Sequence, residues 1–130
     1  MDPFLDSHED LEKSIKLFNR DMESKSVQKA SIFVLMDKRE EFLTQMHGLK
    51  DKLSFFESNI INIKFYKDDV PIKIDSNGRP EDRPNQTVVV IRYKLSILPS
   101  TKLKTQIVSQ EWVLQNEKWY VIPNLDQFIN

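Results

Sequence analysis

The segment from Thr87 to Val121 restricts the possible folds of this chain more than any other stretch. It contains two long runs in which apolar and polar residues alternate, then a short apolar run, with turn-forming residues between them. Alternation with a period of two is typical of half-buried antiparallel strands. We therefore predict three antiparallel strands joined by two hairpins, which close around residues 99–102 and around Asn116 and Glu117.

The two predicted hairpins agree on one buried face. Closing the first hairpin pairs Tyr93 with Val108, and closing the second pairs Trp112 with Val121. Both registers place the large apolar side chains on the same side of the sheet, and such agreement between local signals is expected of a foldable sequence. The opposite face mixes apolar and charged residues: Val88, Val90, Arg92, Lys94, Leu103, Ile107, Glu111, Val113, Tyr120 and Ile122.

The N-terminal half predicts three amphipathic helices and a first strand. Apolar residues recur every three or four positions over residues 5–22, over a short segment after Ser26 and again after Asp37, as on one face of a helix. Residues 54–68 change to a period of two, which predicts a strand. Residues 69–86 contain three prolines, a glycine and many charges, which predict a long exposed connection.

Length and charge limit the class of protein. The chain has 130 residues, enough for one domain with its own core, and its net charge of −1 gives no indication of nucleic-acid binding. It has no apolar run long enough to span a membrane and no cysteine for disulfides or thiolate chemistry. We predict a single α+β domain over residues 1–130, with three N-terminal helices packed on a curved four-stranded antiparallel sheet.

The sequence is compatible with two cellular compartments. No signal peptide follows Met1, which suits a cytoplasmic protein. The cell envelope is the alternative if a signal peptide has been removed upstream. The lack of cysteine does not decide between them.

The order of elements and several motifs resemble the nuclear transport factor 2-like superfamily, also called cystatin-like. The motifs are residues 19–33 at the exit of the first helix, residues 37–42 at the start of the third, and the two-tryptophan segment EWVLQNEKWY at 111–120. The resemblance covers about residues 5–123 and includes small bacterial members of unknown function, some of them envelope lipoproteins. It implies helices that fill the concave side of a bent sheet, and it implies a fold rather than one activity.

Catalytic members of that superfamily place an acid or a histidine inside the cone. The inner strand positions predicted here include no Asp, Glu, His or Lys, so they offer no general base. We therefore predict a non-enzymatic association or ligand-binding module without a metal or cofactor. The predicted pocket residues are Thr87, Tyr93, Gln106, Gln110, Trp112 and Trp119, with core packing as the simpler role of the two tryptophans.

The alternative is a small-molecule lyase or isomerase that uses His47 and Tyr93. His47 lies at the edge of the apolar stripe of the third helix, where a histidine can reach the pocket or simply keep one side in water. His8 lies in the first turn of the first helix and is expected to be solvated. Two isolated histidines make a poor metal site.

The outer sheet face is the predicted interface. An uncovered face this apolar usually marks an interaction site, unless the C-terminal tail or residues 69–86 cover it. Because the superfamily often dimerises through its convex face, the resemblance implies a homodimer, with a small apolar ligand or another protein as further candidate partners. Arg92 and Glu111 are expected nearly across from each other, where they can pair. The predicted interface residues are Val90, Arg92, Ile107, Glu111, Val113, Tyr120 and Ile122.

Overall fold

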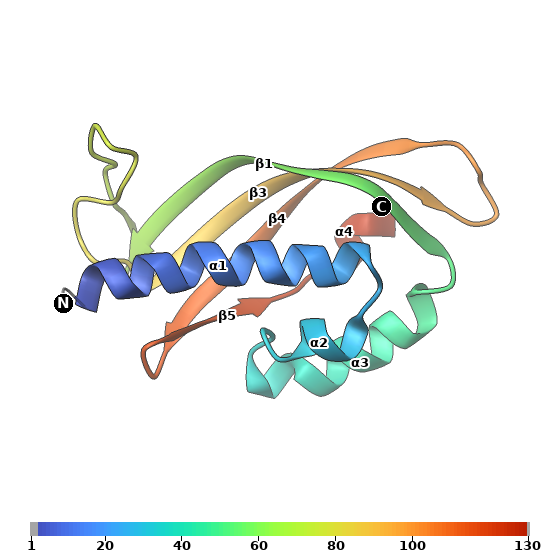
Figure 1. Cartoon of the computed structure of the whole chain (residues 1–130), viewed down its shortest axis with the longest axis horizontal. Helices are drawn as coiled ribbons and strands as arrows, with labels where there is room; N and C mark the ends of the chain where they lie inside the picture. Colours follow the sequence, from blue (N-terminus) through green and yellow to red (C-terminus); the bar gives the residue numbers. More distant parts are fainter. Residues whose placement is uncertain (1–2, 130) are drawn as a thin grey trace.

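The computed structural model describes the backbone of residues 3–129 and the side chains of residues 8–128. Within these residues, three helices precede the sheet: α1 (Pro3–Glu23), α2 (Val27–Ser31) and α3 (Met36–Leu49). The strands are β1 (Leu53–Lys67), β2 (Val70–Pro71), β3 (Gln86–Ile97), β4 (Lys104–Gln115) and β5 (Lys118–Ile122), followed by the short helix α4 (Asp126–Ile129). The sheet is antiparallel with the order β2-β1-β3-β4-β5, and α1 lies along its concave side (Figure 1). The predicted α+β class is confirmed, with five strands instead of four.

The strand that the sequence did not predict is the two-residue β2. It pairs with the end of β1 across a turn in which Asp68 and Asp69 have φ values of 50° and 67°. Two successive positive φ values are typical of a tight two-residue hairpin. Beyond Pro71 one further hydrogen bond joins the two segments, from the N–H of Ile72 to the carbonyl of Phe65 at 2.9 Å. A two-residue strand cannot be predicted from the alternation of apolar and polar residues, because that pattern needs more residues to be recognised.

Two bulges bend β1 over α1. The register between β1 and β3 shifts between Phe55 and Glu57 and again between Ile60 and Asn62. An extra residue on one strand bends it and increases its twist, so β1 arches across the helix (Figure 1). The predicted period of two through residues 54–68 is therefore interrupted at Ile61, whose side chain is 48% exposed.

The two long hairpins differ in register from the prediction. Trp112 pairs with Val121 as predicted, across a turn whose two residues have φ values of 52° and 66°. Tyr93 pairs with Gln106 instead of Val108, because the last pair joins Leu95 to Lys104, so that the connection between paired residues spans 96–103 instead of 99–102. This correction is a shift of two residues, which leaves every side chain on its predicted face.

The core lies between the helices and the concave face of the sheet. Phe18 of α1 meets Trp112 of β4 edge to face, with ring centroids 5.9 Å apart. At the open end of the cone, Phe128 of α4 packs against Phe55 and Tyr93 with centroid distances of 5.4 and 5.2 Å. The C-terminal tail therefore completes the core rather than covering the outer face. The buried apolar residues of α1 and α3 are Leu11, Ile15, Phe18, Met22, Phe42 and Met46.

Other parts of the chain cover two points along the edge formed by β4 and β5. Where β4 extends past β5, Ser109 donates its backbone N–H to Oε1 of Gln127 at 2.9 Å, and its carbonyl accepts from Nε2 at 3.0 Å. Beyond β5, Val34 forms a parallel bridge with Val121. None of the helices in residues 3–129 combines the length and apolar character needed to cross a membrane.

Candidate functional site

Four side chains form a hydrogen-bonded network inside the cone. Asn19 comes from α1, Tyr93 from β3, and Gln110 and Trp112 from β4. The Tyr93 hydroxyl donates to Oδ1 of Asn19, and Nε2 of Gln110 donates to the same oxygen at 2.7 Å. Nε1 of Trp112 donates to Oε1 of Gln110 at 3.1 Å, and Nδ2 of Asn19 donates to the carbonyl of Ile15 at 2.9 Å. The network thus satisfies its own polar atoms, as buried polar groups require.

The phenol of Tyr93 stays protonated at neutral pH. Burial raises the pKa of this group well above its ordinary value, and the negative charge of Glu23 acts in the same direction. The hydrogen bond with Gln110 acts in the opposite direction but does not offset the other two. A neutral phenol donates a hydrogen bond to Asn19, and it does not serve as a general base in this state.

The other predicted pocket residues lie on the inner face around this network. Thr87 is fully buried opposite Trp112, and its Oγ1 has no hydrogen-bond partner among the described residues. Gln106 is half-buried and lies directly opposite Tyr93. Trp119 is 3% exposed, and its backbone N–H donates to Oδ2 of Asp10 at 3.4 Å.

Sequence reasoning missed Asn19, which connects α1 to Tyr93 of β3 and Gln110 of β4 through hydrogen bonds. Its signal is weak but physical. Asparagine is a poor helix former, and here it stands within a 21-residue helix directly after the buried Phe18. A helix tolerates such a residue more readily when the side chain has a specific partner, which Tyr93 and Gln110 provide.

The structure separates the two residues of the enzyme alternative. His47 is exposed and lines a groove between α2 and α3, whereas Tyr93 is buried inside the cone. The expectation for His8 was wrong. Its side chain is 10% exposed, lies 3.2 Å from Glu12 and packs against Phe65, because α1 begins at Pro3 and His8 is already in its second turn. In the described part of the chain, no three His, Asp or Glu side chains gather to hold a metal ion.

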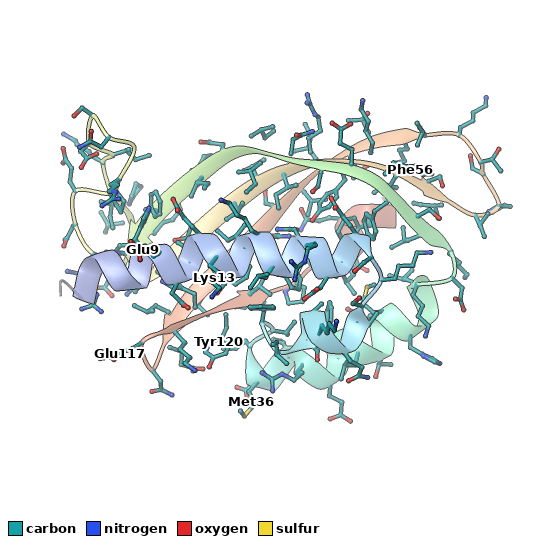
Figure 2. All side chains as sticks on the ribbon, viewed as in Figure 1. Glu9, Lys13, Met36, Phe56, Glu117 and Tyr120 are labelled. Atoms are coloured by element: carbon teal, nitrogen blue, oxygen red, sulfur yellow. The ribbon has the colours of Figure 1, made fainter. Side chains whose placement is uncertain are left out.

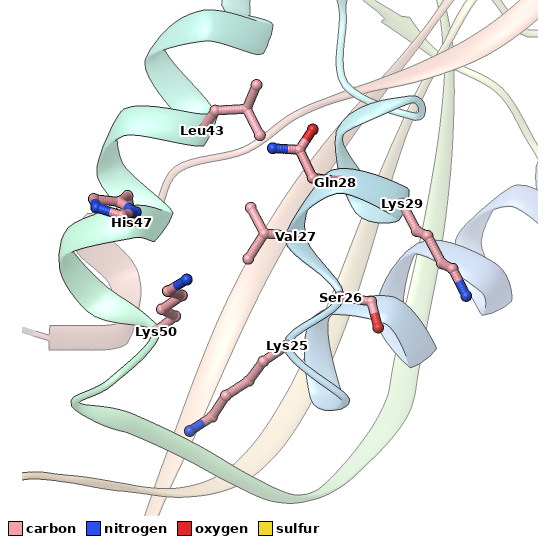
Figure 3. A pocket seen from close by; sticks show the side chains of 8 residues that line it. All are labelled: Lys25, Ser26, Val27, Gln28, Lys29, Leu43, His47 and Lys50. Atoms are coloured by element: carbon pink, nitrogen blue, oxygen red, sulfur yellow. The ribbon is translucent and has the colours of Figure 1, made fainter.

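Two recesses open on the helical side of the molecule. One has a volume of about 290 Å³, lies between α1 and β1, and reaches Asn19 beneath Lys16, Arg20 and Glu23. The other has a volume of about 400 Å³ and lies between α2 and α3, away from the network (Figure 3). The residues that line this second recess are Lys25, Ser26, Val27, Gln28, Lys29, Leu43, His47 and Lys50.

The outer sheet face carries the residues predicted for an interface. Arg92 and Ile107 are exposed and lie directly opposite each other on β3 and β4, with Ile107 58% exposed. Tyr120 follows the hairpin tip at Glu117 (Figure 2). The half-buried members of the predicted interface are Val90, Glu111, Val113, Tyr120 and Ile122.

The expected approach of Arg92 to Glu111 within one chain was wrong. Glu111 lies opposite Val88 and accepts a hydrogen bond from Nε2 of Gln86 at 2.9 Å. The cause is the two-residue change in the β3–β4 register, which moves Glu111 further along the strand from Arg92.

The helices on the concave side of the bent sheet define an α+β cone. Comparison of the chain with protein-family models, with curated proteins and with solved structures finds no match. Membership of the nuclear transport factor 2-like superfamily therefore stays a prediction from the sequence motifs.

Proposed function

We propose that this protein is a non-enzymatic association module of the nuclear transport factor 2-like type and that it forms a twofold homodimer through its outer sheet face. The observation that carries the proposal is the exposed Ile107, which lies beside Arg92 in the middle of that face. Apolar surface in contact with water forgoes about 25 cal/mol for each Å² that a partner would bury.

The interior supports association rather than catalysis. The buried strand side chains of the described chain include no acid, histidine or lysine. Their polar groups Tyr93 and Gln110 are hydrogen-bonded to Asn19 and to each other, so they are committed to the fold. A general base needs a proton-accepting group within reach of its substrate, and this network places none there.

A second copy of the chain fits the outer face because its charges are arranged for twofold symmetry. Val90 lies opposite Ser109 near the middle of the β3–β4 pair. The Arg92–Ile107 pair lies two residues away in one direction, and the Val88–Glu111 pair lies two residues away in the other. A twofold axis that lies in the plane of the interface and crosses the strands at Val90 places the Arg92–Ile107 pair of one copy against the Val88–Glu111 pair of the other. One patch then serves both subunits, and Arg92 of one copy lies diagonally across from Glu111 of the other, one strand away.

The dimer is tested by placing a charge on the face. Ile107→Asp is expected to give a folded monomer, because an unpaired carboxylate in an apolar interface loses its hydration. Light scattering at micromolar concentration measures the mass, and circular dichroism reports the fold. Ile32→Asp is the matched control, since Ile32 is 61% exposed on the helical side and its replacement should leave the dimer intact.

Two outcomes contradict the proposal. A wild-type protein that is already monomeric removes the interface, and an unfolded Ile107→Asp variant means that Ile107 belongs to the core. A charge exchange gives independent support. Arg92→Glu and Glu111→Arg are each expected to weaken the dimer by about 0.5–1 kcal/mol, and the double variant to restore most of that loss.

A further inference from the structure

The groove between α2 and α3 combines an apolar floor with a polar rim. Val27 of α2 and Leu43 of α3 are half-buried and pack against the core. His47 follows Leu43 by four residues, and Lys50, the C-cap residue of α3, follows His47 by three, which places all three on one stripe that faces α2. The volume of about 400 Å³ is within the range of small-molecule sites.

The charged groups of this groove are cationic. Its lining includes Lys25, Lys29 and Lys50, and the described lining residues include no carboxylate. The ion pairs between described side chains form elsewhere and involve none of these lysines. The chain as a whole has 20 acidic and 19 basic residues and is nearly neutral, whereas the charged residues that line the groove are lysines. A recess lined by one sign of charge attracts counter-ions and charged ligands.

Lys25 is held over the groove at a backbone position that favours glycine. Its φ is 59°, and it is the left-handed residue that ends α1. The N–H of Ser26 donates to the carbonyl of Asp21 at 2.8 Å and the N–H of Lys25 to that of Met22 at 3.1 Å, the pattern of a Schellman motif. A side chain at this position is disfavoured relative to glycine. The turn itself therefore gives no reason for a lysine here.

Lys25 and Lys50 lie on the same side of α2. Figure 3 shows both side chains on the side of α2 where His47 and Val27 lie, whereas Lys29 extends on the other side. Two ammonium groups and an imidazole thus border one opening above an apolar floor. This arrangement suits a ligand with a charged head and an apolar body.

We propose that this groove binds a phosphomonoester of an apolar group. At neutral pH a phosphomonoester carries a charge of about −1.5 to −2 and three acceptor oxygens. It can therefore interact with Lys25 and Lys50 together, which a carboxylate with a single charge does less well. The apolar group lies against Val27 and Leu43, and its size is limited by the groove.

The test is an NMR titration of ¹⁵N-labelled full-length protein with phenyl phosphate. We expect saturable shifts in the amides of residues 25–29 and 43–50. Inorganic phosphate lacks the apolar group and benzoate lacks the second charge, so both should bind more weakly. Affinity should fall as salt rises, because the charges of the groove are in contact with water.

Matched variants assign the binding to the groove. Lys25→Gln with Lys50→Gln is expected to weaken phenyl phosphate binding by roughly tenfold or more. Lys38→Gln with Lys104→Gln removes the same charge from exposed positions outside the groove and should change affinity by no more than about twofold. Lys25→Gly alone should weaken binding while the thermal midpoint stays the same or rises, a combination that a purely structural role of Lys25 does not produce.

A second titration identifies the source of the phosphomonoester. Vesicles that contain phosphatidic acid carry the same head group in a membrane. Saturable binding of phenyl phosphate indicates a soluble ligand, and binding to the vesicles alone, lost in the Lys25→Gln, Lys50→Gln variant, indicates a lipid. The proposal is overturned if no probe shifts the groove amides, or if the double variant binds as tightly as the wild type. Ile107→Asp should retain the binding, so the groove and the dimer are tested separately.

Discussion

Polar side chains inside the cone form hydrogen bonds with one another, whereas the charged side chains of the groove between α2 and α3 all have the same sign. Inside, Tyr93, Gln110 and Asn19 use one another as hydrogen-bond partners. In the groove, Lys25 and Lys50 have no carboxylate partner among the described residues. Polar groups that satisfy each other's hydrogen bonds stabilise and specify a fold. Like charges that gather without an oppositely charged partner can instead attract a charged ligand. The fold of this protein therefore depends on its interior, whereas the binding that we propose depends on its surface.

The largest effect is expected from the interior. Trp112→Ala removes a fully buried aromatic side chain that packs on Phe18 and donates to Gln110. It should lower the free energy of unfolding by about 3–5 kcal/mol, as for other buried aromatic residues. Urea denaturation followed by circular dichroism measures this change. An unchanged midpoint would mean that Trp112 is not part of the core.

A smaller loss is expected when the network is opened but the core volume is largely kept. Gln110→Leu leaves the indole N–H of Trp112 and an acceptor site on Asn19 without their partner. Unsatisfied buried groups cost about 1–3 kcal/mol, which the same denaturation experiment measures. Gln115→Leu on the exposed end of β4 is the control, and its effect should stay within about 0.5 kcal/mol. Equal effects of the two variants would contradict the role of the network.

The raised pKa of Tyr93 predicts a loss of stability in strong alkali. The folded state holds the phenol neutral, whereas the unfolded state releases its proton near the ordinary value of about 10. The stabilisation is therefore complete below that pH and is lost as the pH rises toward the raised folded value. One such group contributes a slope of up to about 1.4 kcal/mol per pH unit. Tyr93→Phe should decline less steeply in denaturation curves above pH 10, and identical slopes would contradict the burial of a neutral phenol.

The smallest effects on stability are expected in the groove. Lys50→Ala should change the free energy of unfolding by no more than about 0.5 kcal/mol, because Lys50 forms no ion pair among the described side chains. Lys25→Gly should raise it by up to about 1 kcal/mol, since glycine relieves the positive φ. Thermal unfolding measures both. If either variant lowered the free energy of unfolding by more than about 2 kcal/mol, the groove residues would stabilise the fold as much as the interior residues do, against this prediction.

The parts of the fold that the sequence predicted are those set by local chemistry. The β4–β5 register followed from two strands separated by Asn116 and Glu117, because a two-residue loop permits one pairing. The β3–β4 register was two residues off, since a longer connection leaves several closures open. The bulge at Ile61 was not predictable, because it depends on how β1 has to bend over α1.

The sites were harder to predict than the fold because they depend on contacts between distant segments. Tyr93, Gln110 and Trp112 were recognised as inner residues from strand parity, but their partner Asn19 comes from a helix far away in the sequence. The groove arises from the packing of α2 against α3. Its one local signal, the stripe of Leu43, His47 and Lys50, also fits a solvated helix face.

The cover that Gln127 provides for Ser109 has a consequence for how copies of this protein can assemble. A side-chain amide presents N–H donors and a carbonyl acceptor side by side, much as a peptide group does, so Gln127 occupies the place that a strand from another molecule would take. Val34 does the same beside Val121 at the neighbouring edge. Pairing between exposed edges can propagate without limit, whereas a twofold contact between faces ends at two subunits. The cover at Ser109 and Val121 thus hinders open-ended pairing along this edge of the sheet.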